Sequence, residues 1–234
     1  MKSFSIIIPA YNEEDNISKI RTELVPAISR ITKNYEIIVV DDGSNDSTAL
    51  KVKALKKKNK HIFLVSYKPN KGIGHALSTG IKYAKKDLTV FLDSDMTFHP
   101  KDIQQLFLRF EKGDIDFVIG SPFNDQNEAV FWRLTLSKIV NRVYCVLLGS
   151  RINAITPIFR LYKTKQIKEL NIGSRGFDIN VEILFKLLQN KRKFAEVPVK
   201  LGKREFGVSK LNYFKESLNH LKLVSKIIKW KLFK

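Results

Sequence analysis

The 234-residue sequence predicts an α/β fold, in which a mostly parallel sheet is flanked by helices and followed by C-terminal amphipathic helices. Short apolar runs alternate with segments of helical spacing through the first half of the chain, the pattern of parallel strands joined by helical crossovers. Two acidic clusters, Asp41-Asp42-Gly43-Ser44 and Asp93-Ser94-Asp95, directly follow two of these runs. In an open α/β sheet, ligands bind outside the carboxyl ends of the strands, so both clusters mark a candidate site.

The first half of the chain contains most of the predicted sheet. The predicted strands are 4–8, 35–40, 61–66, 88–92 and 116–120, and the predicted helices are 15–31, 46–58, 72–84 and 100–112. Residues 46–48 can cap the second helix, and Pro100 suits the first turn of the fourth. Pro26 is expected to bend or interrupt the first helix, because proline lacks the N–H that a helix interior needs.

The second half is less regular. A long helix is predicted over 130–148, a short strand over 159–162 and a helix over 177–190. Residues 194–201 are predicted to form an edge strand, a position that tolerates Pro198. The last segment, 210–234, is predicted to be an amphipathic helix with apolar positions at Leu211, Phe214, Leu218, Leu221, Val224, Ile228 and Leu232.

The composition excludes several classes of protein. The single cysteine, Cys145, excludes an intramolecular disulfide framework and a cysteine-rich zinc site, and its apolar neighbours indicate a buried, inert thiol. The apolar part of the N-terminus is too short for a signal peptide, and no apolar run approaches the roughly 18 residues that span a bilayer. We therefore expect a protein of the reducing cytoplasm that is soluble or lies on a membrane surface.

The acidic clusters stand out because the formal net charge of the chain is +19. Taken singly, each could be only a turn or the start of a helix, where acidic side chains suit the dipole. Their recurrence at successive strand ends favours a divalent metal that carries a nucleotide diphosphate, because hard cations take oxygen ligands and bridge phosphates.

Four motifs carry a family resemblance: Pro9-Ala10-Tyr11-Asn12-Glu13-Glu14, Asp41-Asp42-Gly43-Ser44, Asn70-Lys71-Gly72-Ile73-Gly74-His75-Ala76 and Asp93-Ser94-Asp95. Their order, over roughly the first 120 residues, resembles the family 2 inverting glycosyltransferases with the GT-A fold. In the second half, residues 193–199 and 204–211 and the Arg133, Ser137, Asn141 ladder resemble dolichyl-phosphate mannose synthases and related polyprenyl-phosphate glycosyltransferases. The Gly72-Ile73-Gly74 run lacks the third glycine of a dinucleotide fingerprint and is interpreted as a tight loop near the nucleotide.

The resemblance implies a domain organisation. A GT-A catalytic domain would cover 1–205, with a nucleotide-sugar half at 1–120 and an acceptor half at 121–205 that contains the interface helix 130–148. Residues 206–234 would form a C-terminal signature loop and a basic amphipathic helix.

The resemblance also implies roles for individual residues. The nucleotide sugar would be held by Pro9, Tyr11, Glu13, Val40, Asp42, Asp93, Ser94 and Asp95. Asp93, Asp95 and Arg204 would be catalytic, and Asp95 and Thr97 would face a Mg²⁺ or Mn²⁺ ion that offsets charge on the leaving nucleoside diphosphate. Arg133, Ser137, Arg204 and Lys210 would bind the phosphate groups of donor or acceptor.

The implied reaction moves a hexose, mannose or glucose, from GDP-mannose or UDP-glucose to dolichyl or polyprenyl phosphate. Such an acceptor is already anionic and needs no strong general base, which agrees with a structural interpretation of His75 and His99. Three positions depart from the family pattern: Thr97 replaces a usual glutamine, Pro122 replaces a usual arginine, and 154–160 reads Ala-Ile-Thr-Pro-Ile-Phe-Arg in place of Asp-Pro-Thr-Ser-Gly-Phe-Arg. They leave both the sugar and the acceptor open.

The C-terminal tail suggests a membrane surface as a partner. It carries Lys222, Lys226, Lys229, Lys231 and Lys234 without an acidic residue among them, together with Trp230 and Phe233. Basic amphipathic helices with aromatic residues bind membrane interfaces, so we expect a peripheral location at the cytoplasmic membrane face. Packing against the catalytic domain, or against a membrane-anchoring subunit, is the alternative.

Three other functions compete with the leading one. A lipid-linked or cell-surface glycan acceptor would need a general base, for which Asp178 and Glu182 are the candidates in the second half. An inactive homologue would account for Thr97 and Ala154. A nucleic-acid-binding protein would account for the charge alone, but the chain has no recognisable binding motif and the acidic clusters would stay unexplained, so no nucleic acid partner is expected.

Overall fold

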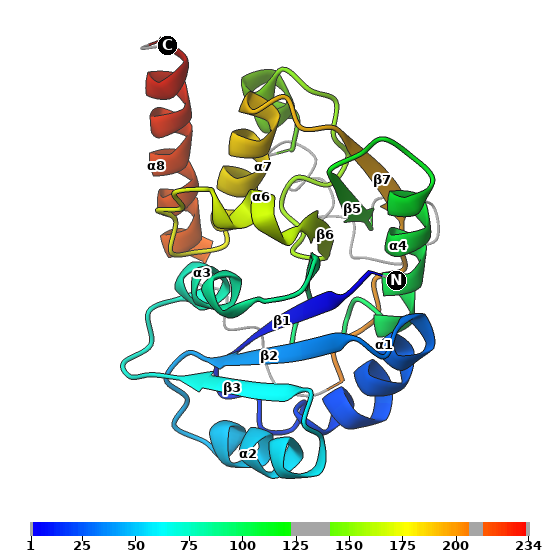
Figure 1. Cartoon of the computed structure of the whole chain (residues 1–234). Helices are drawn as coiled ribbons and strands as arrows, with labels where there is room; N and C mark the ends of the chain where they lie inside the picture. Colours follow the sequence, from blue (N-terminus) through cyan, green and yellow to red (C-terminus); the bar gives the residue numbers. More distant parts are fainter. Residues whose placement is uncertain (1, 123–140, 206–212, 233–234) are drawn as a thin grey trace.

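A seven-stranded sheet forms the centre of the protein, with the strand order β3-β2-β1-β4-β6-β5-β7. The computed structural model describes residues 2–122, 141–205 and 213–232 (Figure 1). The strands are β1 (Phe4–Ala10), β2 (Tyr35–Asp41), β3 (Ile62–Ser66), β4 (Leu88–Phe91), β5 (Phe117–Ser121), β6 (Arg160–Lys163) and β7 (Phe194–Pro198). The predicted α/β fold with a mostly parallel sheet is confirmed, and β7 lies at the sheet edge, where Pro198 was expected to be tolerated.

The strand register brings the acidic clusters to one edge of the sheet. Strand β1 pairs in parallel with β2 on one side and with β4 on the other, so Ala10 lies opposite Asp41 and Ile7 opposite Phe91. Every residue of β1, β2 and β4 is buried, as expected for parallel strands covered on both faces. Among the strands of the described residues, only β6 runs antiparallel to its neighbours, β4 and β5, a direction that its apolar pattern could not predict.

Helices cover both faces of this sheet. On one face, α3 (Ile73–Tyr83) approaches β1 so closely that a Cβ at Gly80 would meet the Ile7 side chain. On the other face, the ring of Phe107 in α4 (Ile103–Glu111) packs edge-on against Phe4. Because side chains alternate along a strand, Phe4 and Ile7 must point to opposite faces. The remaining helices are α1 (Val25–Ile31), α2 (Thr48–Lys58), α6 (Thr164–Lys168), α7 (Ile179–Gln189) and α8 (Tyr213–Leu232).

Several elements differ from the sequence-based expectation. The predicted helix 15–31 is interrupted: a π-helical turn, Ile20–Leu24, precedes α1, and Pro26 lies in the first turn of α1, where its missing N–H costs nothing. Pro100 opens a short 3₁₀ turn, Pro100–Asp102, before α4. The helix α6 was not predicted, because five residues are too few to show helical periodicity. Of the predicted helix 130–148, residues 141–148 are described and are helical.

The last helix, α8, packs with a different face from the one predicted. Leu223 and Ile227 are the buried residues, and the ring of Trp230 stacks on Phe185 of α7. Of the predicted apolar stripe, Val224 is half-buried and packs against the core, whereas Leu218, Leu221, Ile228 and Leu232 are exposed. In Figure 1, α8 stands along one side of the molecule, beside α7. Within the described part of the chain, no helix has both the length and the apolar character needed to cross a membrane.

Candidate functional site

The loops that follow β1 and β2 are joined by hydrogen bonds between their motifs. The amide of Asn12 donates to Ser44 Oγ at 2.9 Å, and the amide of Asn45 donates back to Asn12 Oδ1 at 2.8 Å. The amide of Glu13 donates to Thr48 Oγ1 at 2.8 Å. Asn12 has a φ of 51°, a left-handed conformation that asparagine tolerates better than most residues. The first two motifs therefore form one connected structure.

The two aspartates at the end of β2 hold the surrounding loops. Asp41 accepts from the amide of Ser44 at 3.0 Å and from the hydroxyl of Ser66 at 2.7 Å. Asp42, only 3% exposed, accepts from the amides of Lys71 and Gly72, both at 2.8 Å. Asp42, which was predicted to bind the nucleotide, thus fixes the loop before α3 through these two hydrogen bonds.

The second acidic cluster lies beyond the end of β4. Asp95 is 5% exposed, and its Oδ1 accepts from both the amide and the hydroxyl of Thr97 at 3.0 Å. Its Oδ2 accepts from Arg204 Nε at 2.8 Å and pairs with Arg204 Nη2 at 2.7 Å. The structure therefore brings the predicted site residues Asp95, Thr97 and Arg204 together, although 109 positions separate Asp95 from Arg204.

The surroundings of Asp93 disfavour the charged form of its carboxyl. Burial, with smaller contributions from the charges of Asp95 and Glu13, raises the pKa of its carboxyl to about 7, against the opposing effect of Arg204. Glu13 lies close by, with Oε1 3.9 Å from Arg204 Nη1. A carboxyl whose pKa is raised by burial and by neighbouring carboxylates is a frequent mark of a functional site.

This donor set fits a hard divalent cation. Asp93 and Asp95 supply the oxygen ligands that Mg²⁺ and Mn²⁺ prefer. Among the described residues, no group of three or more His, Cys, Asp or Glu side chains is arranged to hold a metal alone. The arrangement suits an ion that takes one or two carboxylates from the protein and its other ligands from phosphate and water, as Mg²⁺ usually does.

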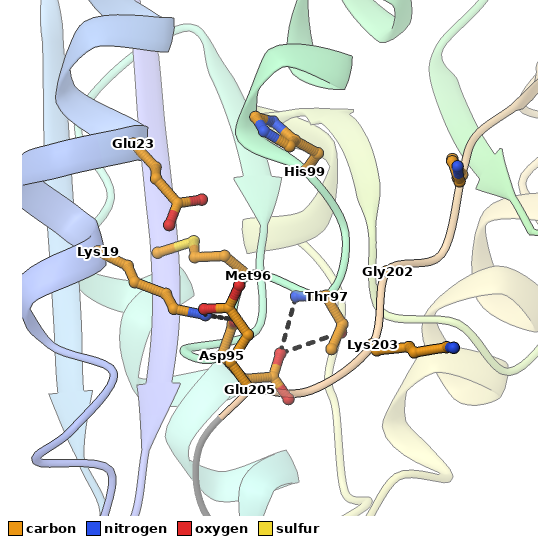
Figure 2. Close-up of a pocket in the computed structure, with 10 residues that line it drawn as sticks. Lys19, Glu23, Asp95, Met96, Thr97, His99, Gly202, Lys203 and Glu205 are labelled. Carbon is orange, nitrogen blue, oxygen red and sulfur yellow. Dashed lines mark hydrogen bonds and ion pairs between the residues drawn. The ribbon is translucent and has the colours of Figure 1, made fainter.

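A cavity of about 420 Å³ adjoins Asp95 (Figure 2). The π-helical turn and the residues before it contribute Lys19 and Glu23, and the segment after β7 contributes Lys200, Gly202, Lys203 and Glu205. Lys19 Nζ donates to the backbone carbonyl of Asp95 at 3.2 Å and pairs with Glu205 at 2.7 Å. The sequence did not indicate that Lys19 belongs to the site, because Lys19 lies on a predicted helix with other polar residues.

The glycines before α3 serve a contact that the sequence did not reveal. The amide of Gly74 donates to the carbonyl of Arg175 at 2.8 Å, and a Cβ at Gly74 would lie 2.6 Å from Arg175 C. A Cβ at Gly72, which has a φ of 95°, would lie 2.6 Å from Arg175 O. The two glycines therefore let the loop 173–178 of the second half pack directly on the loop that Asp42 organises.

The candidate general bases of the second half are held by hydrogen bonds. Glu182 accepts from the amides of Gly173 and Ser174, the latter at 2.7 Å, and pairs with Lys186 at 2.6 Å. Burial alone would raise the pKa of Glu182, but these hydrogen bonds outweigh it and hold the pKa below its usual range. Asp178 precedes α7 and accepts from the amide of Gly176 at 3.0 Å. Glu182 is thus a structural carboxylate and an unsuitable base.

The sequence did not indicate the structural role of Arg160, which is buried. Arg160 of β6 is fully buried, and its guanidinium donates to the carbonyl of Asn180 at 2.8 Å and to those of Ala154 and Ile155. It forms no ion pair with a carboxylate of the described residues. Arg160 therefore fixes the segment 154–155, one of the places where the chain departs from the family pattern.

The remaining predicted residues fall into four groups. Pro9 and Val40 are buried neighbours in the sheet and support the loops that follow, Ser94 is buried, and Tyr11 is half-buried. His99 caps the turn before α4 by accepting from the amide of Lys101, and His75 packs edge-on against Tyr67. Cys145 is half-buried rather than buried, and its thiol donates to the carbonyl of Ile152. Arg133, Ser137 and Lys210 lie outside the described residues.

Comparison with known proteins places this site in a family context. The profile of glycosyl transferase family 2 matches residues 5–176. The fold is similar to that of glucosyl-3-phosphoglycerate synthase from Mycobacterium tuberculosis in complex with Mn²⁺, UDP-glucose and phosphoglyceric acid. The TM-score is 0.74 at 19% sequence identity, and the match covers 97% of this chain and 79% of that chain. A complex of the same enzyme with Mn²⁺, UDP and phosphoglyceric acid gives a TM-score of 0.72 at 20% identity, covering 97% and 77% of the two chains.

Proposed function

The chain belongs to glycosyl transferase family 2, and from that premise we propose that it transfers a hexose from a nucleotide sugar to a dolichyl or polyprenyl phosphate. The observation that carries the proposal is the cluster of Asp93, Asp95 and Arg204 at the carboxyl end of β4. Mannose from GDP-mannose and glucose from UDP-glucose are the two candidate donors. Because the fold is shared with an enzyme solved with UDP-glucose, that donor is tested first.

Each residue of the cluster has a distinct role in the proposed reaction. Asp95, held by Thr97, and Asp93 would bind Mg²⁺ or Mn²⁺, which when bound would offset the charge that develops on the leaving nucleoside diphosphate. Arg204 would bind a phosphate group through its planar fork of N–H donors. Glu13, on the loop after β1, would face the ribose, and Asp42 would act indirectly by holding the loop at Lys71 and Gly72.

The second half of the chain supports a phosphate acceptor over a glycan hydroxyl. A hydroxyl needs a general base, and Glu182 is committed to backbone amides and to Lys186. A phosphate monoester is already anionic and needs positive groups, which Arg204 and the cavity residues Lys19, Lys200 and Lys203 would supply. Asp178 remains the residue to test if a glycan proves to be the acceptor.

The outward face of α8 supports a membrane surface as a partner. Four leucine or isoleucine side chains are exposed there, between 42% and 74%, at Leu218, Leu221, Ile228 and Leu232. Lys222, Lys226 and Lys229 are exposed on the same helix. Because packing on the catalytic domain uses Leu223 and Ile227 instead, the apolar stripe stays available for lipid. We propose peripheral attachment at the cytoplasmic membrane face, where a polyprenyl phosphate would be reached.

Vesicle binding tests this attachment. The protein is expected to cosediment with anionic vesicles at low salt and to be released as salt is raised, because each lysine near anionic lipid contributes about 1 kcal/mol and is screened by salt. A Leu221→Ser, Leu232→Ser variant should bind more weakly, and a Leu108→Ser variant, changed at an exposed leucine of α4, should bind like the wild type. Absence of binding at low salt would favour a membrane-anchoring subunit on this face.

The reaction itself is tested by transfer from radiolabelled GDP-mannose and UDP-glucose to a short polyprenyl phosphate, with Mg²⁺, Mn²⁺ or EDTA. We expect labelled lipid from one donor only, and none in EDTA. Parallel reactions with an oligosaccharide and with 3-phosphoglycerate distinguish the glycan acceptor and the small phosphorylated acceptor seen with the structural relative. Nucleotide binding without any product would indicate an inactive homologue.

A further inference from the structure

The segment 201–205 lies across the loop that follows β4. Leu201 forms an antiparallel bridge with Phe98, and the amide of Gly202 donates to the carbonyl of Thr97 at 2.7 Å. A Cβ at Gly202 would lie 3.3 Å from the same carbonyl, so the two backbones are in close contact. Figure 2 shows Gly202, Lys203 and Glu205 passing beside Asp95 and Thr97.

Three ion pairs fix the end of this segment, the longest being that between Arg204 Nη1 and Glu13 Oε1 at 3.9 Å. Arg204 binds Asp95, with side chains 30% and 6% exposed, and Glu205 binds Lys19 at 2.7 Å. Lys19 also donates to the backbone carbonyl of Asp95. Asp95 is therefore approached by one side-chain cation at its carboxylate and by another at its backbone.

The hydrogen bonds of Asp95 leave little room for a further cation. Two donors of Thr97 occupy Oδ1, and two donors of Arg204 occupy Oδ2. A divalent ion bound at Oδ2 would lie within a few ångströms of the guanidinium, and the two positive charges would repel each other strongly because Asp95 is only 5% exposed. The ion and Arg204 must compete for this carboxylate.

We propose that Arg204 is an internal counter-ion, which holds the segment 201–205 on Asp95 until a divalent cation replaces it and frees the guanidinium for a phosphate group. This inference rests on the proposed metal role of Asp95. It predicts an order of events, in which the metal ion opens the segment and the phosphate then takes the released arginine. It also predicts that the protein alone binds the metal more weakly than its carboxylates would allow.

Calorimetric titration of the full chain with Mn²⁺, in the absence of nucleotide, tests the competition. Arg204→Gln is expected to bind Mn²⁺ about tenfold more tightly than the wild type, the ratio that corresponds to one charge-assisted hydrogen-bonded contact. Lys200→Gln is the matched control, because it removes the same charge from an exposed residue of the same cavity. Its affinity for Mn²⁺ should stay within about twofold of that of the wild type. Equal or weaker binding by Arg204→Gln would overturn the proposal.

Two further measurements separate the possible failures. If Asp95→Asn binds Mn²⁺ as well as the wild type, the metal role of Asp95 is wrong, and the proposed counter-ion is wrong with it. If Asp95→Asn abolishes binding but Arg204→Gln changes nothing, only the counter-ion is wrong. Hydrogen exchange in the wild type avoids any folding defect of a variant: saturating Mn²⁺ should speed exchange of the 202–205 amides several-fold, and unchanged or slower exchange would contradict the release of this segment.

Discussion

The carboxylates beyond β4 and the carboxylate of Glu182 in α7 have opposite electrostatic environments. At the strand ends of the first half, Asp93 and Asp95 lie close together near Glu13, and the pKa of Asp93 is raised to about 7. In the second half, Glu182 accepts from the backbone amides of the loop 173–174 and has a lowered pKa. The hydrogen-bonded Glu182 fixes a loop, whereas the repulsion between Asp93 and Asp95 favours the binding of a cation beside Asp93.

This difference distinguishes the acidic residues suited to bind a cation from those that hold loops, which the sequence alone could not do. Acidic residues occur in both halves, and Asp93, beyond β4, is the carboxyl whose pKa is raised to about 7 by burial and by neighbouring carboxylates. The loop 173–178 connects the two regions, since Gly74 binds its backbone from one side and Glu216 of α8 accepts from the amide of Phe177 at 2.9 Å from the other. Removal of Asp95 should therefore reduce activity, and removal of Glu182 should reduce the stability of the fold.

The largest expected effect is on activity at Asp95. Asp95→Ala removes the carboxylate that would bind the metal and should lower metal-dependent turnover by about 10³-fold or more, because electrostatic stabilisation of the leaving group is lost. The fold should remain, as measured by circular dichroism and thermal unfolding. Asp178→Ala is the comparison from the second half, and turnover that falls as far in Asp178→Ala as in Asp95→Ala would contradict the assignment of the chemistry to the cluster of Asp93, Asp95 and Arg204.

The next effect is on stability at Glu182. Glu182→Ala leaves the amides of Gly173 and Ser174 without their acceptor and removes the anionic partner of Lys186, which keeps the carbonyl of Asn171 as an acceptor. It should reduce the free energy of unfolding by about 3 kcal/mol. Urea denaturation measures this loss. As a control, Glu14→Ala breaks an exposed pair with Lys51 and should cost less than about 0.5 kcal/mol. Similar losses in the two variants would show that Glu182 is not a structural carboxylate.

A smaller loss is expected where the two regions meet. Gly74→Ala places a Cβ 2.6 Å from the backbone of Arg175 and should destabilise the protein by about 2 kcal/mol, because neither backbone can give way cheaply. Gly173→Ala, on the same loop, meets nothing closer than 4.0 Å and should change stability by less than about 0.5 kcal/mol. Thermal unfolding of both variants at one pH makes the comparison, and equal melting temperatures would exclude the close contact.

The smallest effect is the pH dependence that comes from Asp93. Its carboxyl has a pKa of about 7 in the folded protein against 3.8 as the reference value, so the folded state binds more protons between these limits. The metal-free protein should therefore lose stability as pH rises from about 4 to about 7, by about 1 kcal/mol because Asp93 is partly exposed. Asp93→Asn should remove this slope when urea midpoints are measured in EDTA. A slope that is the same in both proteins would assign it to other groups.

Much of the fold could be predicted because its signals are local. Apolar runs gave β1 to β5 within one or two residues at each end, and the motif residues at the strand ends followed from the parallel register of β1, β2 and β4. The short helix α6 and the antiparallel direction of β6 could not be predicted, because neither leaves a periodic signal in the sequence. The same holds for the packing face of α8, because the burial of Leu223 and Ile227 and the stacking of Trp230 on Phe185 depend on tertiary packing.

The sequence by itself determined the α/β fold, the family and the position of the acidic clusters, because hydrophobic periodicity and strand-end motifs depend on neighbouring residues along the chain. Only the tertiary structure decided which charges meet: that Arg204 and Lys19 approach Asp95, that Glu182 is bound by backbone amides, and that Gly72 and Gly74 receive the backbone of Arg175. The physical reason is that these contacts join residues far apart in sequence, and the free energy of a charge is set by the neighbours that folding brings to it and by the water that folding removes.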